Sequence, residues 1–263
     1  MHFSGPIKYL ISEKEMKSRK PYSYVADIYP HMMSFINYKD WAEYYYLLTK
    51  DFLPQDAKIL ELAAGNCSLA SHLKKFYRNI IVSDYSLEMM KKNNVKGLKK
   101  VCCDMVQLPF KTKFDLIFSA FDSFNYLLTK KALTKLFLQT RDLLEDNGIF
   151  SFDVSLESNS KKHLRYLNRK RIYNEIRYTQ KSFYIDQKRM HINKFLIKYP
   201  DGAEVEETHY QRIYPMEVFF DLLTNSGFYV RNCFSAFTFE DATGQSQRIQ
   251  FVVLKNNKNA NNK

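Results

Sequence analysis

The stretch from Lys58 to Cys67 limits most strongly what this chain can fold into. It begins with an apolar run, residues 58–62, that contains one acid, Glu61. A turn of small residues follows, Ala63-Ala64-Gly65, and residues 69–76 then place apolar side chains at helical spacing. The order strand, tight turn and helix is typical of an open α/β sheet, in which ligands bind beyond the carboxyl ends of the strands. Small residues in this turn would allow a ligand to approach the backbone closely.

The chemistry of the turn disfavours a dinucleotide as that ligand. A pyrophosphate site carries G-x-G-x-x-G, whereas only Gly65 is present here and Glu61 would repel a phosphate. The pattern acid-x-small-x-Gly-x-small, Glu61 to Cys67, resembles motif I of the class I methyltransferases, with Ala63 at the usual first glycine. The resemblance implies that Glu61, Ala63 and Gly65 bind S-adenosylmethionine, whose ammonium and sulfonium suit an acid. An ordinary strand-to-helix turn is the alternative interpretation of this motif alone.

A second acidic motif follows at the spacing expected of a nucleoside site. Residues 79–84 predict a strand that ends in Asp84, which lies 23 residues beyond Glu61. An acid at the end of the second strand, about 20 residues along, is where a ribose diol is bound. The run that starts at Asp84 is similar to the family's D-x-S-x-x-M-L pattern. The resemblance implies cofactor contacts from Asp84, Tyr85 and Met89.

The third and fourth strands are expected to end beside the same ligand. Asp104 and Met105 end the third predicted strand, and in the resembled family these two positions meet the adenine amino group and its ring. Ser119 and Phe121 lie at the end of the fourth predicted strand. We therefore expect all four residues to bind the cofactor, because the carboxyl ends of parallel strands meet at one edge of a sheet.

Asp122, Tyr126 and His209 are the candidate catalytic residues. Residues 122–127 resemble the D-S-x-N-Y-L stretch of bacterial small-molecule methyltransferases. Methyl transfer from a sulfonium is an in-line displacement that needs no metal. A neutral amine attacks with little help, whereas a hydroxyl needs a base such as a histidine or a carboxylate. Asp122 also suits a helix cap, which is an alternative role. Further candidates by location alone are Glu207, Tyr210 and His31.

The predicted fold is α/β: a Rossmann-like seven-stranded methyltransferase sheet with helices on both faces, and a small inserted antiparallel β-sheet. The family resemblance implies that the last strand of the large sheet runs antiparallel. Asn37 and Thr129 are predicted helix N-caps, and Asn147-Gly148 is a predicted helix stop. Strands of the large sheet are predicted at residues 58–62, 79–84, 100–104, 114–120, 148–154, 229–237 and 248–254.

The α/β alternation breaks after residue 154. Residues 155–172 are basic and predict a solvated crossover, with a binding surface as the alternative. Three segments of alternating polarity follow, at 175–184, 190–199 and 203–213, with a Pro200-Asp201-Gly202 turn between the last two. In the resembled group, an antiparallel sheet at this point covers the active site and contacts the substrate. We therefore expect a three-stranded inserted sheet.

The expected domain organisation follows from this break. A cofactor-binding α/β domain comprises residues 21–154 and 215–255, and a lid comprises residues 155–214. Tyr24 lies in a tyrosine-rich segment that could fold over the cofactor, and we assign it to that site. Residues 1–20 are expected to be a flexible lead-in and residues 256–263 a disordered tail.

Composition indicates the cellular compartment of the protein more than it indicates the substrate. Four cysteines lack metal spacing, so reduced thiols in a cytoplasmic protein are the simplest account, and no stretch predicts a signal peptide or a membrane span. We expect no metal site. The net charge of +12 permits acidic partners without choosing one. We expect a small-molecule substrate. An RNA or protein methyltransferase and a non-catalytic S-adenosylmethionine-binding protein remain alternatives, and the oligomeric state is open.

One loop bears on the nucleic-acid alternative. The fourth-strand loop is Phe121-Asp122-Ser123-Phe124. It lacks the Asn-Pro-Pro-Tyr type of motif that favours methylation of a base's exocyclic amine. This counts against one class of nucleic-acid methyltransferase without excluding the others, so nucleic acid is the less favoured substrate.

Overall fold

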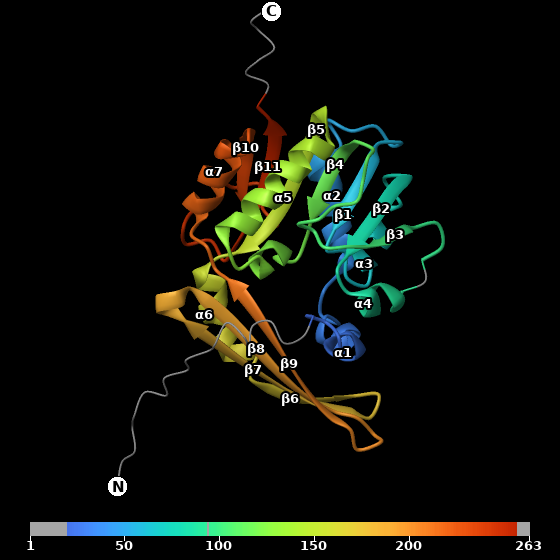
Figure 1. The fold of residues 1–263 in the computed structure, drawn as a ribbon, viewed down its shortest axis with the longest axis vertical. Coiled ribbons are helices and arrows are strands. Elements are labelled where there is room, and N and C mark those ends of the chain that lie inside the picture. Colours follow the sequence, from blue (N-terminus) through green and yellow to red (C-terminus); the bar gives the residue numbers. More distant parts are fainter. Residues whose placement is uncertain (1–19, 94, 257–263) are drawn as a thin grey trace, which may run out of the picture.

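A computed structural model describes residues 20–93 and 95–256. In this part of the chain the strands form two sheets, one seven-stranded and one four-stranded. The large sheet has the order β10-β11-β5-β4-β1-β2-β3, and the small sheet lies beneath its lower edge in the view of Figure 1. The expected lead-in and tail fall largely on residues 1–19 and 257–263, which lie outside the described residues.

The large sheet confirms the predicted fold class. Neighbouring strands pair in parallel from β3 to β5, whereas β11 pairs antiparallel with both β5 and β10. The strand implied to be antiparallel by the resemblance is therefore antiparallel. The strands are β1 (Lys58–Leu62), β2 (Asn79–Asp84), β3 (Lys99–Cys102), β4 (Phe114–Ser119), β5 (Leu144–Ser155), β10 (Phe228–Ser235) and β11 (Arg248–Lys255).

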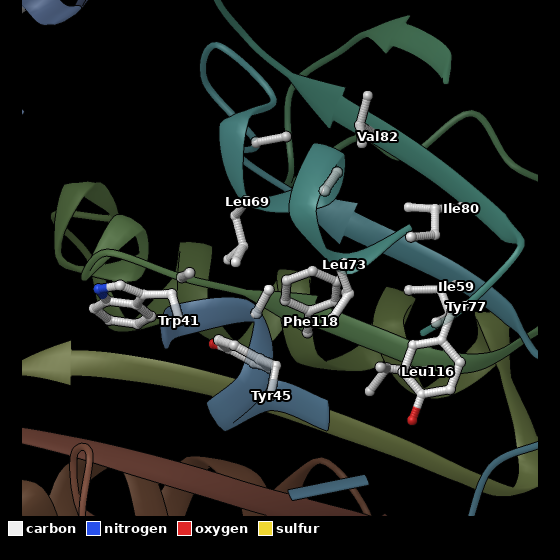
Figure 2. Packing of buried hydrophobic residues seen from close by; sticks show 14 of the residues in the cluster. Trp41, Tyr45, Ile59, Leu69, Leu73, Tyr77, Ile80, Val82, Leu116 and Phe118 are labelled. Atoms are coloured by element: carbon white, nitrogen blue, oxygen red, sulfur yellow. The ribbon is translucent and has the colours of Figure 1, made fainter. Parts of the chain in front are cut away.

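Helices cover both faces of this sheet because its strands alternate apolar side chains between two cores. Leu116 and Phe118 of β4 pack in one core with α2 (Tyr38–Thr49) and α3 (Ser68–Leu73). Ile117, between them, packs in the other core with α5 (Lys130–Leu143) and α7 (Met216–Asn225). Figure 2 shows Tyr45 of α2 beside Phe118 in the first core, with Trp41 of the same helix farther along. The short helix α4 (Leu87–Lys91) follows β2.

Local capping explains where two of these helices begin. The Asn37 side chain accepts a hydrogen bond from the Lys39 N–H before α2, and Thr129 accepts one from Ala132 before α5. Both predicted caps are confirmed. The predicted stop at Asn147-Gly148 is wrong, because α5 ends at Leu143 and β5 already begins at Leu144.

Close packing accounts for Gly148 within this strand. A Cβ on Gly148 would lie 2.8 Å from Cγ of Leu144, so glycine is needed there for contact within β5. The pairing of β5 with β4 also shifts register between Phe114 and Leu116. This irregularity absorbs the polar residues that had suggested a helix end.

The inserted sheet has four strands, one more than expected. It is antiparallel throughout and contains β6 (Arg169–Tyr173), β7 (Ile176–Ile185), β8 (Met190–Lys198) and β9 (Glu204–Arg212). The predicted basic crossover instead forms α6 (Glu157–Tyr166) and then β6. Asn174 and Glu175 both have positive φ and make the tight turn to β7. Because β6 is an edge strand with exposed residues on both faces, its sequence lacks an apolar alternation.

A short N-terminal helix, α1 (Val25–Met32), joins the two sheets. Its Val25 and Ile28 are fully buried against Tyr178, Phe195 and Ile197 of the small sheet. In Figure 1 this helix lies between the small sheet and α4. The chain from residue 20 onward therefore crosses the open edge where strands of the large sheet end. Across residues 20–93 and 95–256, none of the helices has the length and apolar character needed to cross a membrane.

Candidate active site

A cavity of about 350 Å³ lies beyond the carboxyl ends of β1, β2 and β4. The turn after β1 and the end of β2 form one part of its wall, and the inserted sheet and N-terminal segment form another. This volume falls within the range typical of small-molecule sites. Nine of the predicted site residues line it: Ala63, Gly65, Asp84, Tyr85, Met89, Asp104, Met105, Phe121 and Tyr126.

The turn after β1 has the conformation that a close ligand approach requires. Ala63 and Gly65 both have positive φ, +52° and +55°. A Cβ on Gly65 would lie 3.1 Å from Cε of Met89, so a side chain here would crowd the cavity wall. The Ala64 N–H donates to the Ser83 carbonyl at 2.9 Å and holds the turn against β2. Non-glycine residues with positive φ are costly and tend to occur at functional sites.

Asp84 is fixed by the backbone around it. One carboxylate oxygen accepts from the Gly65 N–H and the other from the Ser86 N–H, both at 2.7 Å. Burial raises the pKa of Asp84 above its usual value, although these backbone donors and that of Tyr85 oppose the increase. Each oxygen retains a second lone pair for a ligand hydroxyl. The side chain is therefore oriented before any ligand binds.

Glu61 lies beneath this turn rather than on the cavity wall. Its side chain is 2% exposed, and its Oε2 is buried without a hydrogen-bond partner among the described residues. Burial raises the pKa of Glu61 well above its usual value, and the nearby Asp84 charge adds to the increase. A cation nearby would offset both the burial of Glu61 and the effect of the Asp84 charge on it. The pair therefore fits a cofactor that carries an ammonium and a sulfonium.

Tyrosines form much of the rest of the cavity wall. Tyr22, Tyr29, Tyr38 and Tyr210 line the cavity along with Tyr126. Of these four, sequence reasoning named Tyr210 by location only and did not assign the other three. The tyrosine-rich segment is the available signal, and Tyr24 is the residue assigned within it from the sequence, because that segment could fold over the cofactor. Tyr22 has φ +63°, a turn that brings its ring rather than that of Tyr24 into the cavity wall.

A continuous hydrogen-bonded chain runs from this wall into the inserted sheet. The Tyr22 and Tyr126 hydroxyls are 2.9 Å apart, and the Tyr126 hydroxyl is 3.0 Å from Nδ1 of His209. Nε2 of His209 is 2.6 Å from Oε1 of Glu207. His209 is thus buried behind Tyr126 and does not line the cavity.

Glu207 also anchors the start of α1. Its Oε2 accepts from the backbone N–H groups of Tyr24, at 2.7 Å, and Val25, at 3.0 Å. The Tyr22 N–H donates to its Oε1. Burial alone would raise the pKa of Glu207, but the hydrogen bond with His209 and these backbone donors hold it below the usual value. Glu207 is therefore a buried carboxylate shared by α1 and β9. Tyr24 contributes its backbone here and does not line the cavity.

Asp122 and Ser119 also lie outside the cavity lining. Asp122 Oδ1 is 3.0 Å from Nη2 of Arg248, and its Oδ2 accepts from Ser155 at 2.9 Å and Gln211 at 3.2 Å. Asp122 therefore joins β5, β9 and β11 at the junction of the two sheets. Ser119 donates to the Leu62 carbonyl at 3.0 Å and so links β4 to β1.

Residues 20–93 and 95–256 hold no group of three or more His, Cys, Asp or Glu side chains placed to bind a metal. The four cysteines are free. Cys103 lines the cavity, and burial raises the pKa of its thiol.

Comparisons with known proteins agree with this architecture. A family model described as a methyltransferase domain matches residues 59–148. That segment contains the β1 turn, Asp84 and Asp104, the acidic part of the site. Residues 59–148 therefore form a methyltransferase domain, and the chain is an S-adenosylmethionine-dependent methyltransferase. The family, the enzyme class and the cofactor expected from the sequence are thereby confirmed.

Relatives of this methyltransferase resemble it over nearly their whole length. A Bacillus subtilis (strain 168) protein provisionally named as a methyltransferase, YqeM, is 26% identical over 89% of this chain and 97% of its own. An S-adenosylmethionine-dependent methyltransferase from Clostridium acetobutylicum ATCC 824 has a TM-score of 0.74 and 24% identity, covering 90% of this chain and 99% of that one. An amino pentose methyltransferase from Micromonospora echinaspora, CalS10, solved with S-adenosylmethionine bound, has a TM-score of 0.65 and 13% identity, covering 90% and 99%.

Proposed function

We propose that this methyltransferase transfers a methyl group to a nitrogen or oxygen of a small molecule. The observation that carries the proposal is the cavity itself, whose lining combines acids at the strand ends of the large sheet with several tyrosines and with residues of the inserted sheet. S-adenosylmethionine supplies an electrophilic methyl group when bound. The protein then has to orient the nucleophile and exclude water.

The acidic half is proposed to hold the cofactor. Asp84, with both oxygens oriented by backbone N–H groups, would bind the ribose diol. Asp104 and Met105 would contact the adenine, and Phe121 and Met89 would pack on apolar parts of the ligand. Glu61 would act through its charge from beneath the turn. With these roles, we expect substitutions in this half to change cofactor affinity more than substrate affinity.

The tyrosine half is proposed to hold the substrate. Thr208 and Tyr210 of β9 reach the cavity, so the inserted sheet can cover a substrate and restrict its size. A small molecule with polar groups suits the several hydroxyls there. An amino pentose methyltransferase of similar fold is consistent with such a substrate. The proposal extends to residues 155–214 as a lid that contacts substrate rather than cofactor.

An RNA or protein substrate is the second candidate. Lys170 and Arg171 on the edge strand β6 are exposed and contribute to the net charge of +12. However, Asp84 and Asp104 at the cavity would repel a phosphate backbone from the methyl donor. A small molecule is therefore the better supported substrate.

Two measurements test the proposed function. Calorimetry with S-adenosylmethionine, S-adenosylhomocysteine and NAD should show binding of the first two only. Transfer of a labelled methyl group is then assayed on glucosamine, other amino sugars, aliphatic amines, phenols, bulk RNA and a protein mixture. We expect label in one of the small molecules. Label confined to RNA or protein would instead support the second candidate.

A further inference from the structure

We propose that Tyr22 is a catalytic residue that accepts the proton of the substrate's nucleophile and passes it through Tyr126 to His209. The inference rests on the proposed function, because it assigns how a nitrogen or oxygen nucleophile loses its hydrogen. It also narrows the substrate class to nucleophiles that carry one. Glu207 is assigned the role of a positioning residue behind His209.

The geometry defines the direction of the hydrogen bonds. A carboxylate can only accept, so the 2.6 Å contact with Glu207 places the hydrogen of a neutral His209 on Nε2. Nδ1 is then an acceptor for the Tyr126 hydroxyl at 3.0 Å. Tyr126 in turn accepts from Tyr22 at 2.9 Å. The Tyr22 N–H lies 3.4 Å from Nε2 and donates to the nearer Glu207 oxygen instead, which leaves this tautomer intact.

Burial suits this row of hydrogen-bonded side chains to proton transfer as well as to a structural role. His209 and Glu207 are 2% and 3% exposed, and the ring of Phe195 packs 5.2 Å from that of His209. A proton that arrives on His209 is therefore stabilised by Glu207 with little competition from water. Burial raises the pKa of both Tyr22 and Tyr126, so their hydroxyls remain protonated and can donate and accept at once.

Tyr22 is also placed where both halves of the cavity meet. Its carbonyl accepts from the Ser86 hydroxyl at 3.0 Å, at the start of α4 after Asp84. Its hydroxyl reaches Tyr126 beneath the inserted sheet. A tyrosine with only a structural role could form the hydrogen bond of its hydroxyl within one half of the cavity alone. Tyr22 instead connects the cofactor-binding edge to a buried histidine, which is the position that a proton acceptor needs.

The proposed step balances in atoms and charge. As the nucleophile bonds to the methyl carbon, the carbon–sulfur bond breaks and its electron pair stays on sulfur. The nucleophile's proton moves to the Tyr22 oxygen. Tyr22 gives its own hydroxyl proton to Tyr126, and Tyr126 gives its proton to Nδ1 of His209. The result is a cationic His209 beside the Glu207 carboxylate and two neutral tyrosines. The proton then returns to solvent when the cavity opens.

Tyr22→Phe and Tyr126→Phe test the relay, with Tyr214→Phe as the matched control. Tyr214 is 6% exposed and donates to the Leu127 carbonyl at 3.2 Å, but it does not line the cavity. Kinetics use whichever small molecule of the panel is methylated fastest. We expect kcat to fall roughly a hundredfold or more in both relay variants, as for loss of a general base. We expect the control to keep the wild-type rate and all three to bind S-adenosylhomocysteine normally.

Two further readouts separate a relay from a structural role. The loss in Tyr22→Phe should shrink as pH rises, because the substrate then loses its proton without help. Nitrogen-15 NMR of labelled histidines, with His209→Gln to assign the signal, should show His209 as the Nε2–H tautomer. An unchanged kcat in Tyr22→Phe, or an Nδ1–H tautomer, would overturn the proposal. Failure of the wild type to bind S-adenosylhomocysteine or to methylate any panel member would instead count against the proposed function.

Discussion

Some residues at the cavity can be predicted from the sequence, whereas others come together only in the folded structure. Gly65, Asp84 and Asp104 each follow a short apolar strand, and the carboxyl ends of parallel strands share one edge. Their convergence was therefore predictable. Tyr22 and Glu207 are 185 positions apart, and no local pattern encodes that contact. For the same reason, the sequence points to Tyr24 in the N-terminal segment, whereas the residue that lines the cavity is Tyr22, two positions earlier.

Asp84→Ala should weaken cofactor binding while the protein stays folded. A hydrogen bond to a charged acceptor contributes about 1.5–3 kcal/mol, which corresponds to roughly a tenfold to hundredfold increase in Kd. Calorimetry with S-adenosylmethionine measures it, and circular dichroism controls for folding. Asp115→Ala is the matched control, because Asp115 lies in β4 and does not line the cavity. An unaltered Kd would remove Asp84 from the cofactor site.

Gly65→Val should abolish cofactor binding by a different route. The position has positive φ, and its Cβ would already lie 3.1 Å from Met89, so valine adds both backbone strain and bulk at the cavity wall. Gly202→Val is the control, because that glycine also has positive φ but faces open space. Similar cofactor affinity in both variants would contradict our placement of the turn.

Glu61 predicts a pH dependence of stability for the ligand-free protein. Its pKa is higher in the folded state than in the unfolded chain, so the folded state holds the proton longer. The stabilisation that this proton contributes is therefore complete at pH values below the pKa of Glu61 in the unfolded chain. It falls as the pH rises toward the pKa of Glu61 in the folded protein. Glu61→Gln should raise Tm near pH 8 and change it little near pH 4. Each pKa unit corresponds to about 1.4 kcal/mol, or about 2–4 °C for a chain of this size. An identical Tm difference at both pH values would show that Glu61 is not the cause.

At the scale of elements, apolar runs and caps predicted the large sheet well, and the inserted sheet less well. Buried parallel strands carry continuous apolar sequence, so five strands were placed to within a few residues. The strand β6 was missed because its exposed edge position removes that signal and its pairing to β7 depends on two residues with positive φ. The Asn147-Gly148 turn signal was misleading because β5 bulges there.

Glu207→Ala should release α1 from the inserted sheet. The change removes the acceptor for the Tyr24 and Val25 N–H groups and leaves buried donors unpaired, which costs about 1–3 kcal/mol. We expect faster hydrogen exchange over residues 22–32 and a lower free energy of unfolding. Glu206→Ala is the control, since that neighbour is exposed. Equal exchange in the two variants would show that α1 is held by its apolar contacts alone.

For the whole molecule, charge distribution decides what the net charge of +12 means. Basic residues on the β6 edge lie on the small sheet, whereas carboxylates lie at the cavity. We expect weak binding to bulk RNA that falls steeply between low and physiological salt, because each phosphate contact releases counterions. Filter binding at the two salt concentrations measures it. Tight binding at physiological salt, with label entering RNA, would favour the polymer substrate.

Glu207 both accepts the backbone hydrogen bonds at the start of α1 and supports His209 in the proposed relay. This double role has a kinetic consequence. If ligands enter past the N-terminal segment, its opening would break the hydrogen bonds from the Tyr22, Tyr24 and Val25 N–H groups to Glu207 and would move Tyr22 itself. An open molecule would then lack the proton path, and a closed one would hold its ligands until the reaction is over. Reaction and exchange of ligands would thus be mutually exclusive in time. In quenched-flow experiments we expect a rapid first turnover followed by slower steady-state turnovers. Glu207→Ala should accelerate the steady-state phase and should slow the first turnover in the same variant.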